Sequence, residues 1–177
     1  LPLAKGAPEV QQILSEVKKL ESEGYEFEAA EASFELLIRK HLGRHSSFFE
    51  LLEYHSTHRC NGRQGFETCE ATVKLIINGE NVYTVDDGDG PVNALDRALR
   101  KALTPAYPEI ADVLLLDYKV RIIDGAAGTG ARTRVLITST DGTDTWSTVG
   151  VHLNIIDASW EALVSGFEYY LLKKRPA

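Results

Sequence analysis

The sequence has 177 residues, of which 44% are hydrophobic and 25% charged, and its formal net charge is −7. This composition is typical of a folded chain with a hydrophobic core and excludes a disordered one. The negative charge argues against nucleic acid and anionic membranes as partners, and no apolar run is long enough to cross a bilayer. Because no secretion-signal pattern is present, we expect a cytoplasmic protein.

Methionine is absent from the sequence, including position 1. A natural reading frame begins with methionine, and a domain of this size usually contains more of them. We therefore expect the chain to be part of a longer protein.

The first part of the chain predicts a pair of short helices. Apolar residues recur at helical spacing over about 9–20, and Gly24 is placed to end that helix. A second helix is expected over about 28–41, ended by Gly43. Its apolar side is predicted to hold Ala29, Ala30, Phe34, Leu37 and Ile38. Two such stripes cannot both be buried by the pair alone, so this linker, residues 1–46, is expected to pack on another domain or subunit.

The rest of the chain, residues 47–177, predicts the order βββα twice. In the first repeat (47–104), strands are expected over 48–60, 67–77 and 82–85, with a helix from Gly88–Pro91 to Leu103. In the second repeat (111–174), strands are expected over 113–123, 132–139 and 145–151, with a helix over 154–173. The Asn78-Gly79 pair predicts a tight hairpin because both positions accept a positive φ.

Similar segments support an internal duplication of about sixty residues. Val73–Ile76 resembles Val135–Thr138, 62 positions later, and Asn93–Asp96 resembles Asn154–Asp157, 61 positions later. The expected fold class is α+β, a short helical linker followed by two βββα repeats that form a dimeric domain.

The sharpest local motif is the turn Gly88-Asp89-Gly90-Pro91 at the start of a predicted helix. Its glycines allow unusual backbone angles, and Pro91 suits a first helical turn. Free amides at a helix start favour a carboxylate or phosphate. A tight turn without a ligand explains the same residues equally well.

Motifs for catalysis and metal binding are missing. His41 and His45 are separated by Gly43, and His55 and His58 are three apart on a predicted strand, which directs them to opposite faces. No serine-nucleophile motif and no Gly-Lys-Ser/Thr phosphate loop occurs. We therefore expect no catalytic residue, no metal and no cofactor in this chain.

Cys60 and Cys69 flank a turn-like stretch and could face each other across a hairpin. Without a secretion signal, reduced thiols are favoured over a disulfide.

Several motifs together resemble the linker and regulatory domain of the 2-isopropylmalate and citramalate synthase family. They are the linker stretch Gly24–Leu37, the turn and helix start Gly88–Asp96, and the second-repeat segments Trp146–Val151 and Asn154–Trp160. The resemblance extends over about 9–173. The linker stretch and Trp160 favour the citramalate branch of the family.

The resemblance implies a condensation of acetyl-CoA with pyruvate to (R)-citramalate, on the route to isoleucine. In this family the chemistry occurs in an N-terminal (β/α)8 barrel with a divalent metal, which this chain does not contain. The resemblance also implies a homodimer that binds the end-product amino acid for feedback inhibition.

Carried over to this sequence, the effector site uses the helix start, Gly88, Asp89, Gly90, Pro91, Val92, Asn93 and Ala94. Its apolar wall is expected to include Leu115, Tyr118 and Ile122. Because these three are spaced three and four apart, a flat strand cannot direct them to one side, so a bulge or twist is required.

Three other interpretations remain open. The effector is leucine if the chain comes from a 2-isopropylmalate synthase. A dimerisation module without a ligand predicts a stable dimer and no response to amino acids. A complete small enzyme is disfavoured by the missing catalytic motif.

Overall fold

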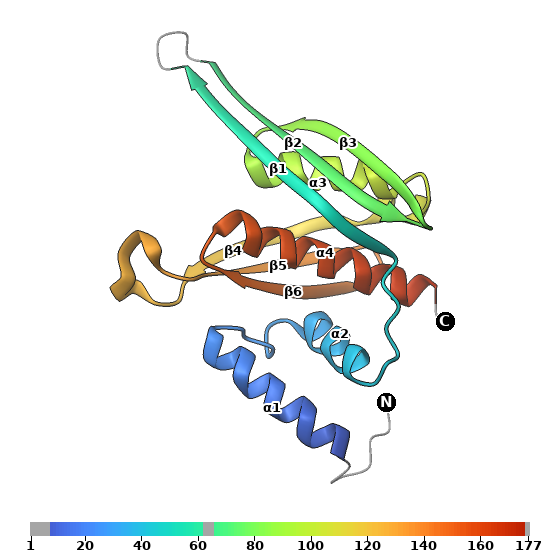
Figure 1. The fold of residues 1–177 in the computed structure, drawn as a ribbon, viewed down its shortest axis with the longest axis vertical. Helices are drawn as coiled ribbons and strands as arrows, with labels where there is room; N and C mark the ends of the chain where they lie inside the picture. The colour runs from blue at the N-terminus through green and yellow to red at the C-terminus, as the bar shows by residue number, and fades with distance from the viewer. Residues whose placement is uncertain (1–7, 62–65, 176–177) are drawn as a thin grey trace. The chain divides into compact units, whose positions relative to one another are not determined.

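The computed structural model describes residues 8–61 and 66–175. These residues form two compact units, one containing those up to Ser46 together with those from Leu114 onward, the other Ser47–Val113. Figure 1 traces the elements in chain order. They are α1 (Pro8–Glu23), α2 (Glu31–His41), β1 (Phe49–Asn61), β2 (Phe66–Ile77), β3 (Glu80–Gly88), α3 (Pro91–Leu103), η1 (Pro108–Asp112), β4 (Leu114–Ile122), η2 (Gly125–Gly130), β5 (Thr133–Thr140), β6 (Thr145–His152) and α4 (Ile155–Lys174).

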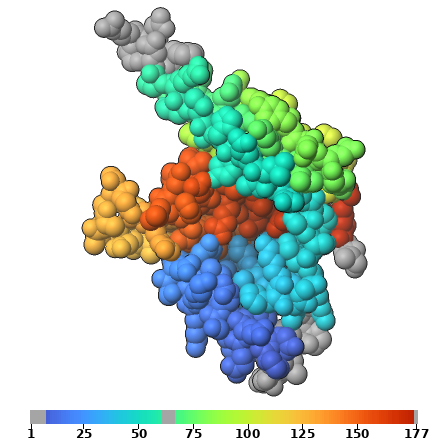
Figure 2. Space-filling view, in the orientation of Figure 1, coloured from blue at the N-terminus to red at the C-terminus, as the bar shows by residue number. Residues whose placement is uncertain are grey.

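The middle unit is the first predicted βββα repeat. Its antiparallel sheet has the order β1-β2-β3, and α3 packs mainly on β2 and β3. Asn78 and Gly79 both have positive φ, 52° and 82°, which confirms the predicted tight hairpin. Fully buried side chains of β2 and α3 form the core, namely Val73, Leu75, Leu95 and Leu99. β1 and β2 extend past α3 as a long hairpin (Figures 1 and 2).

The second repeat forms an antiparallel sheet of order β4-β5-β6, with α4 packed on β5 and β6. Trp146 Nε1 donates to the Gly166 carbonyl (3.1 Å), and the Thr148 hydroxyl donates to the Ala162 carbonyl (2.7 Å). These bonds fix α4 on one face of the sheet. The predicted α+β class with two βββα repeats is therefore confirmed.

The linker packs on the second repeat of its own chain. An apolar cluster joins Ala30 to Val149 and Val151 of β6, with Tyr25 and Phe27 against it. This cluster covers the sheet face opposite α4, because residues of alternate parity on β6 point away from that helix.

The linker also protects the open edge of β6. The Ser147 N–H donates to Glu31 Oε1 (2.9 Å), and the Val149 N–H donates to Ser33 Oγ (3.0 Å). The next outward amide, Val151 N–H, donates to Glu161 Oε2 of α4 (3.1 Å). Side chains thus satisfy three alternate amides of an edge strand, which keeps the edge from pairing with another chain.

The predicted apolar side of the second helix is only partly right: Ala30 is buried as predicted, but Phe34 is not. α2 begins at Glu31 rather than near Glu28, because Ala30 has non-helical angles (φ −142°, ψ 60°). The buried side chains of α2 are Ala32 and Leu36, whereas Phe34 is 37% exposed. The packed side of α2 also holds Ser33, whose hydroxyl accepts from the Val149 N–H at the β6 edge, and this bond orients the helix.

The spacing between the repeats also differs from the prediction. Both first strands carry a bulge, between Leu51 and Glu53 in β1 and between Leu115 and Asp117 in β4. The bulges are 64 positions apart, as are the helix starts Pro91 and Ile155. Equivalent residues are therefore 64 apart, not 62 or 61. In the strands the observed spacing differs from the predicted 62 by two residues. Such a shift leaves the alternation of apolar and polar residues unchanged, so the sequence pattern did not reveal the difference.

The two cysteines are free, Cys60 exposed and Cys69 buried. In the β1–β2 ladder Cys60 lies opposite Glu67 and Cys69 opposite His58, so they are not cross-strand partners. Cys69 Sγ instead lies 3.1 Å from His58 Nδ1.

Asp141 organises the turn between β5 and β6. Its carboxylate accepts from the Asp144 and Thr143 amides (2.8 and 3.0 Å) and pairs with Lys174 (3.0 Å). These amides, and then Lys174, lower the pKa of Asp141 from the usual 3.8 to about 2.

The Asp141→Asn variant is expected to lose stability at neutral pH but not at pH 2. A depressed carboxyl pKa stabilises the fold above the unfolded-state value near 3.8, and this contribution is lost as the pH falls through about 2. Thermal melts between pH 2 and 7 should show the melting temperatures of Asp141→Asn and the wild type converging as the pH falls from 3.8 to about 2. Asp112→Asn, which removes an exposed carboxylate, is the control. A stability difference between Asp141→Asn and the wild type that stays constant over this pH range would contradict the assignment.

Candidate functional site

The predicted turn brings the end of β3 into close contact with the start of α3. A Cβ at Gly88 would overlap the backbone nitrogen of Ala94 and lie 2.7 Å from its Cα. The Asp89 N–H donates to Asn93 Oδ1 (3.1 Å), and the Ala94 N–H donates to the Gly90 carbonyl (2.9 Å). Glycine at position 88 is thus required by the approach of the helix.

The start of α3 leaves backbone amides available. Gly90 is the extended N-cap and provides no side chain, while Pro91 occupies the first turn. Among the described residues, no acceptor lies within hydrogen-bond distance of the Val92 and Asn93 amides. Two free amides at the positive end of a helix can hold a carboxylate. The predicted residues 88–94 therefore do lie together, and the side chains of Asp89 and Asn93 are exposed.

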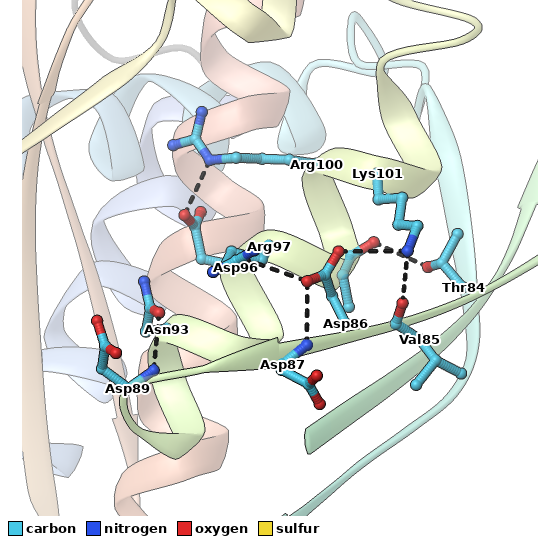
Figure 3. A network of polar contacts seen from close by, with 11 residues as sticks. Thr84, Val85, Asp86, Asp87, Asp89, Asn93, Asp96, Arg97, Arg100 and Lys101 are labelled. Carbon is cyan, nitrogen blue, oxygen red and sulfur yellow. Dashed lines mark hydrogen bonds and ion pairs between the residues drawn. The ribbon is translucent and has the colours of Figure 1, made fainter. Parts of the chain in front are cut away.

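A charged clamp, which the sequence analysis missed, anchors this turn (Figure 3). Asp86 lies 3.3 Å from both Arg97 Nε and Lys101 Nζ of α3, and it accepts from the Asp87 amide (3.0 Å). Desolvation raises the pKa of Asp86, but the hydrogen bond and charge of Lys101, with Arg97, outweigh it and hold the pKa below its usual value. The four-residue spacing of Arg97 and Lys101 was the available signal, since it places both on one helix face.

The predicted apolar wall lies on β4, and the bulge that it required is present. Because of the bulge at Leu116, Leu115 lies opposite Ser139, Tyr118 opposite Ile137 and Ile122 opposite Thr133. These β5 partners alternate regularly, so all three wall residues point to one face of the sheet. That face carries α4, because the Tyr118 and Ser159 hydroxyls are 2.7 Å apart.

On both sides of Tyr118 the side chains of this wall are exposed to solvent. Leu115 is 42% exposed and Ile122 65% exposed, and Val120 between them is also exposed. The wall belongs to one unit and the 88–94 turn to the other. That they line one pocket stays a prediction.

Neither a metal-binding group nor a membrane-spanning helix is found among the described residues. Across residues 8–61 and 66–175, no three His, Cys, Asp or Glu side chains are grouped to hold a metal ion. No helix within these ranges is long and apolar enough to span a membrane.

The sequence matches a known family of protein domains. Residues 28–171 match the LeuA allosteric (dimerisation) domain. The (R)-citramalate synthase of Synechocystis sp. is 49% identical over 97% of this chain, and that of Aquifex aeolicus is 48% identical over 94%. The (R)-citramalate synthase of Geobacter sulfurreducens is 45% identical over 94%.

The similarity covers only part of each relative. The chain spans 32% of the Synechocystis and Aquifex proteins and 31% of the Geobacter protein. The matched residues 28–171 include α2 and nearly all of the two βββα repeats, whereas α1 lies before them. The chain therefore belongs to the LeuA allosteric (dimerisation) domain family.

Proposed function

We propose that this chain is the regulatory domain of an (R)-citramalate synthase and that it binds isoleucine as a feedback inhibitor. The proposal is supported above all by the similarity to three (R)-citramalate synthases, which extends through the linker as well as the repeats. In this proposal a cytoplasmic enzyme condenses acetyl-CoA with pyruvate. The reaction takes place in a metal-dependent barrel outside these residues, and this chain contributes no catalytic group.

The chemistry of the α3 start suits an amino acid. The free amides of Val92 and Asn93 match its α-carboxylate, and the exposed Asp89 carboxylate is available to its ammonium group. An apolar wall such as Leu115 and Ile122 then selects the side chain. Isoleucine and leucine differ only in methyl placement, so shape is expected to separate them by about 1–3 kcal/mol.

The proposed homodimer gives the open face of β4 a partner. Leu115, Val120 and Ile122, which share the face that carries α4, are 42%, 40% and 65% exposed, an apolar surface that isolated soluble chains rarely leave uncovered. Feedback requires the amino acid to bind two states of the dimer unequally. We expect the linker to transmit the change of state, because hydrogen bonds join it to β6 of the second repeat.

Thermal-shift titrations with isoleucine, leucine and valine test the proposal. Isoleucine should raise the melting temperature most. A larger effect of leucine would favour the regulatory domain of a 2-isopropylmalate synthase, and no effect of any amino acid would favour a ligand-free dimerisation module. With acetyl-CoA and pyruvate the chain should form no product.

Asp89→Asn is expected to weaken isoleucine binding about 10-fold, because a charged hydrogen bond contributes about 1.5–3 kcal/mol. Isothermal titration measures this directly. The matched control is Asp87→Asn, which removes the same charge from an exposed carboxylate on the preceding strand. Equal affinities for the two variants would rule out the proposed role of Asp89.

A further inference from the structure

A second candidate site lies on the sheet face opposite α4, within the unit that contains the linker. Lys119 and Arg121 on β4 and Arg134 on β5 share this face, and Arg121 lies directly opposite Arg134 in the ladder. Like charges directly opposite each other destabilise a sheet. Three cations on one face of a chain with a net charge of −7 therefore need an explanation.

These side chains surround a hollow of about 230 Å³. It is lined by Glu26, Ala29, Lys119, Arg121, Arg134 and Leu136. Arg134 pairs with Glu26 and donates to the Gly24 carbonyl, and Lys119 pairs with Asp117 (2.6 Å). The Arg121 side chain has no hydrogen bond or ion pair with any residue of the described ranges. The hollow thus offers one uncommitted guanidinium beside two partly neutralised cations.

The first repeat provides an internal comparison. At the spacing of 64 positions, Arg121 corresponds to Thr57 and Arg134 to Glu70, which lie opposite each other in the β1–β2 ladder. Lys119 corresponds to His55. The fold forms this sheet face without opposed arginines, so the sheet itself does not require the pair. Arg134 also holds the linker through Glu26 and the Gly24 carbonyl, whereas Arg121 has no such role.

We propose that this hollow binds a phosphate-bearing small molecule, a phosphate monoester or a diphosphate. The Arg121 guanidinium presents parallel N–H groups that match two phosphate oxygens, and Lys119 adds a point charge. Arg134 is a third cation, shared with the Glu26 carboxylate. The negative charge of Glu26 opposes the ligand. Because Glu26 belongs to the linker, the ligand contacts the segment between α1 and α2.

Titration of the 177-residue chain with inorganic pyrophosphate and phosphate, followed by calorimetry, tests the proposal. Arg121→Gln should weaken pyrophosphate binding about 10-fold, and Arg121→Lys, which keeps the charge without the fork, should weaken it less. Glu26→Gln should tighten it several-fold, because the competing carboxylate is lost. Affinity should fall steeply with added salt.

The control is Arg44→Gln, which removes the same charge at an exposed position of the same unit and should bind as the wild type does. The Arg121 side chain has no hydrogen bond or ion pair to lose, and its charge opposes that of Arg134, so Arg121→Gln should keep or raise the wild-type melting temperature without ligand. Equal weakening by Arg121→Gln and Arg44→Gln would overturn the proposal in favour of nonspecific charge attraction. An absence of pyrophosphate binding to the wild type would overturn it outright.

Discussion

Gly150→Ala is expected to destabilise the second repeat by about 3 kcal/mol, the upper part of the usual range for overpacking. A Cβ at this position would overlap the Ala158 carbonyl oxygen and lie 2.9 Å from Glu161 Cβ and 3.0 Å from the Ala162 nitrogen. Two of these three atoms belong to the backbone of α4, which cannot move aside like a flexible side chain. The helix must shift away from β6 to accept one methyl group.

Chemical denaturation measures this loss as a lower free energy of unfolding. Gly130→Ala is the matched control, because a Cβ there meets no atom within 4 Å and the backbone needs no positive φ. It should change stability by less than about 1 kcal/mol. If both variants unfolded at the same denaturant concentration, α4 would not lie on β6 as described.

Leu36→Ala is expected to cost about 2–4 kcal/mol, the usual range for a buried leucine. Leu36 is 3% exposed and is the main apolar anchor of α2, although it lies in the linker. Phe34→Ala, two residues earlier on the same helix, removes more atoms but from a side chain that is 37% exposed. It should cost less than about 1 kcal/mol.

This pair of variants also separates two descriptions of the linker. The predicted helix face buries Phe34, whereas the observed face buries Leu36. Urea denaturation of both variants, followed by circular dichroism, gives the order of the two losses. A greater loss for Phe34→Ala would mean that the predicted face is the packed one.

Much of the fold was predictable because local chemistry determined it. Asn78-Gly79 specified its hairpin, and the 88–91 turn marked the start of α3. The bulge in β4 followed from the spacing of Leu115, Tyr118 and Ile122 together with the resemblance. Each conclusion depended on a few adjacent residues and a steric rule.

The missed features depend on distant partners. The packed side of α2 is set by the β6 edge, which lies more than a hundred residues away in the sequence. The clamp on Asp86 needs α3 to fold back on β3 before Arg97 and Lys101 reach it. The opposed pair Arg121 and Arg134 becomes visible only once the strand register is known.

The expected division into a linker over 1–46 and a regulatory domain over 47–177 stays a prediction. In the structure the linker and the second repeat form one compact unit. A ligand that alters β6 or α4 therefore acts on the linker through direct contacts, such as the Tyr25 hydroxyl, which donates to Glu161 Oε1 (2.6 Å). This arrangement gives the proposed feedback signal a physical route.

The most direct test of the proposed regulatory function is an amide-resolved NMR titration of the labelled chain with isoleucine. Isoleucine is expected to produce saturable shifts at the amides of Asp89 to Ala94, above all Val92 and Asn93, together with shifts along β4. The amides around Arg121 and Arg134 should respond to pyrophosphate in a separate titration. Isoleucine-induced shifts confined to other parts of the chain, or none at all, would contradict the effector site.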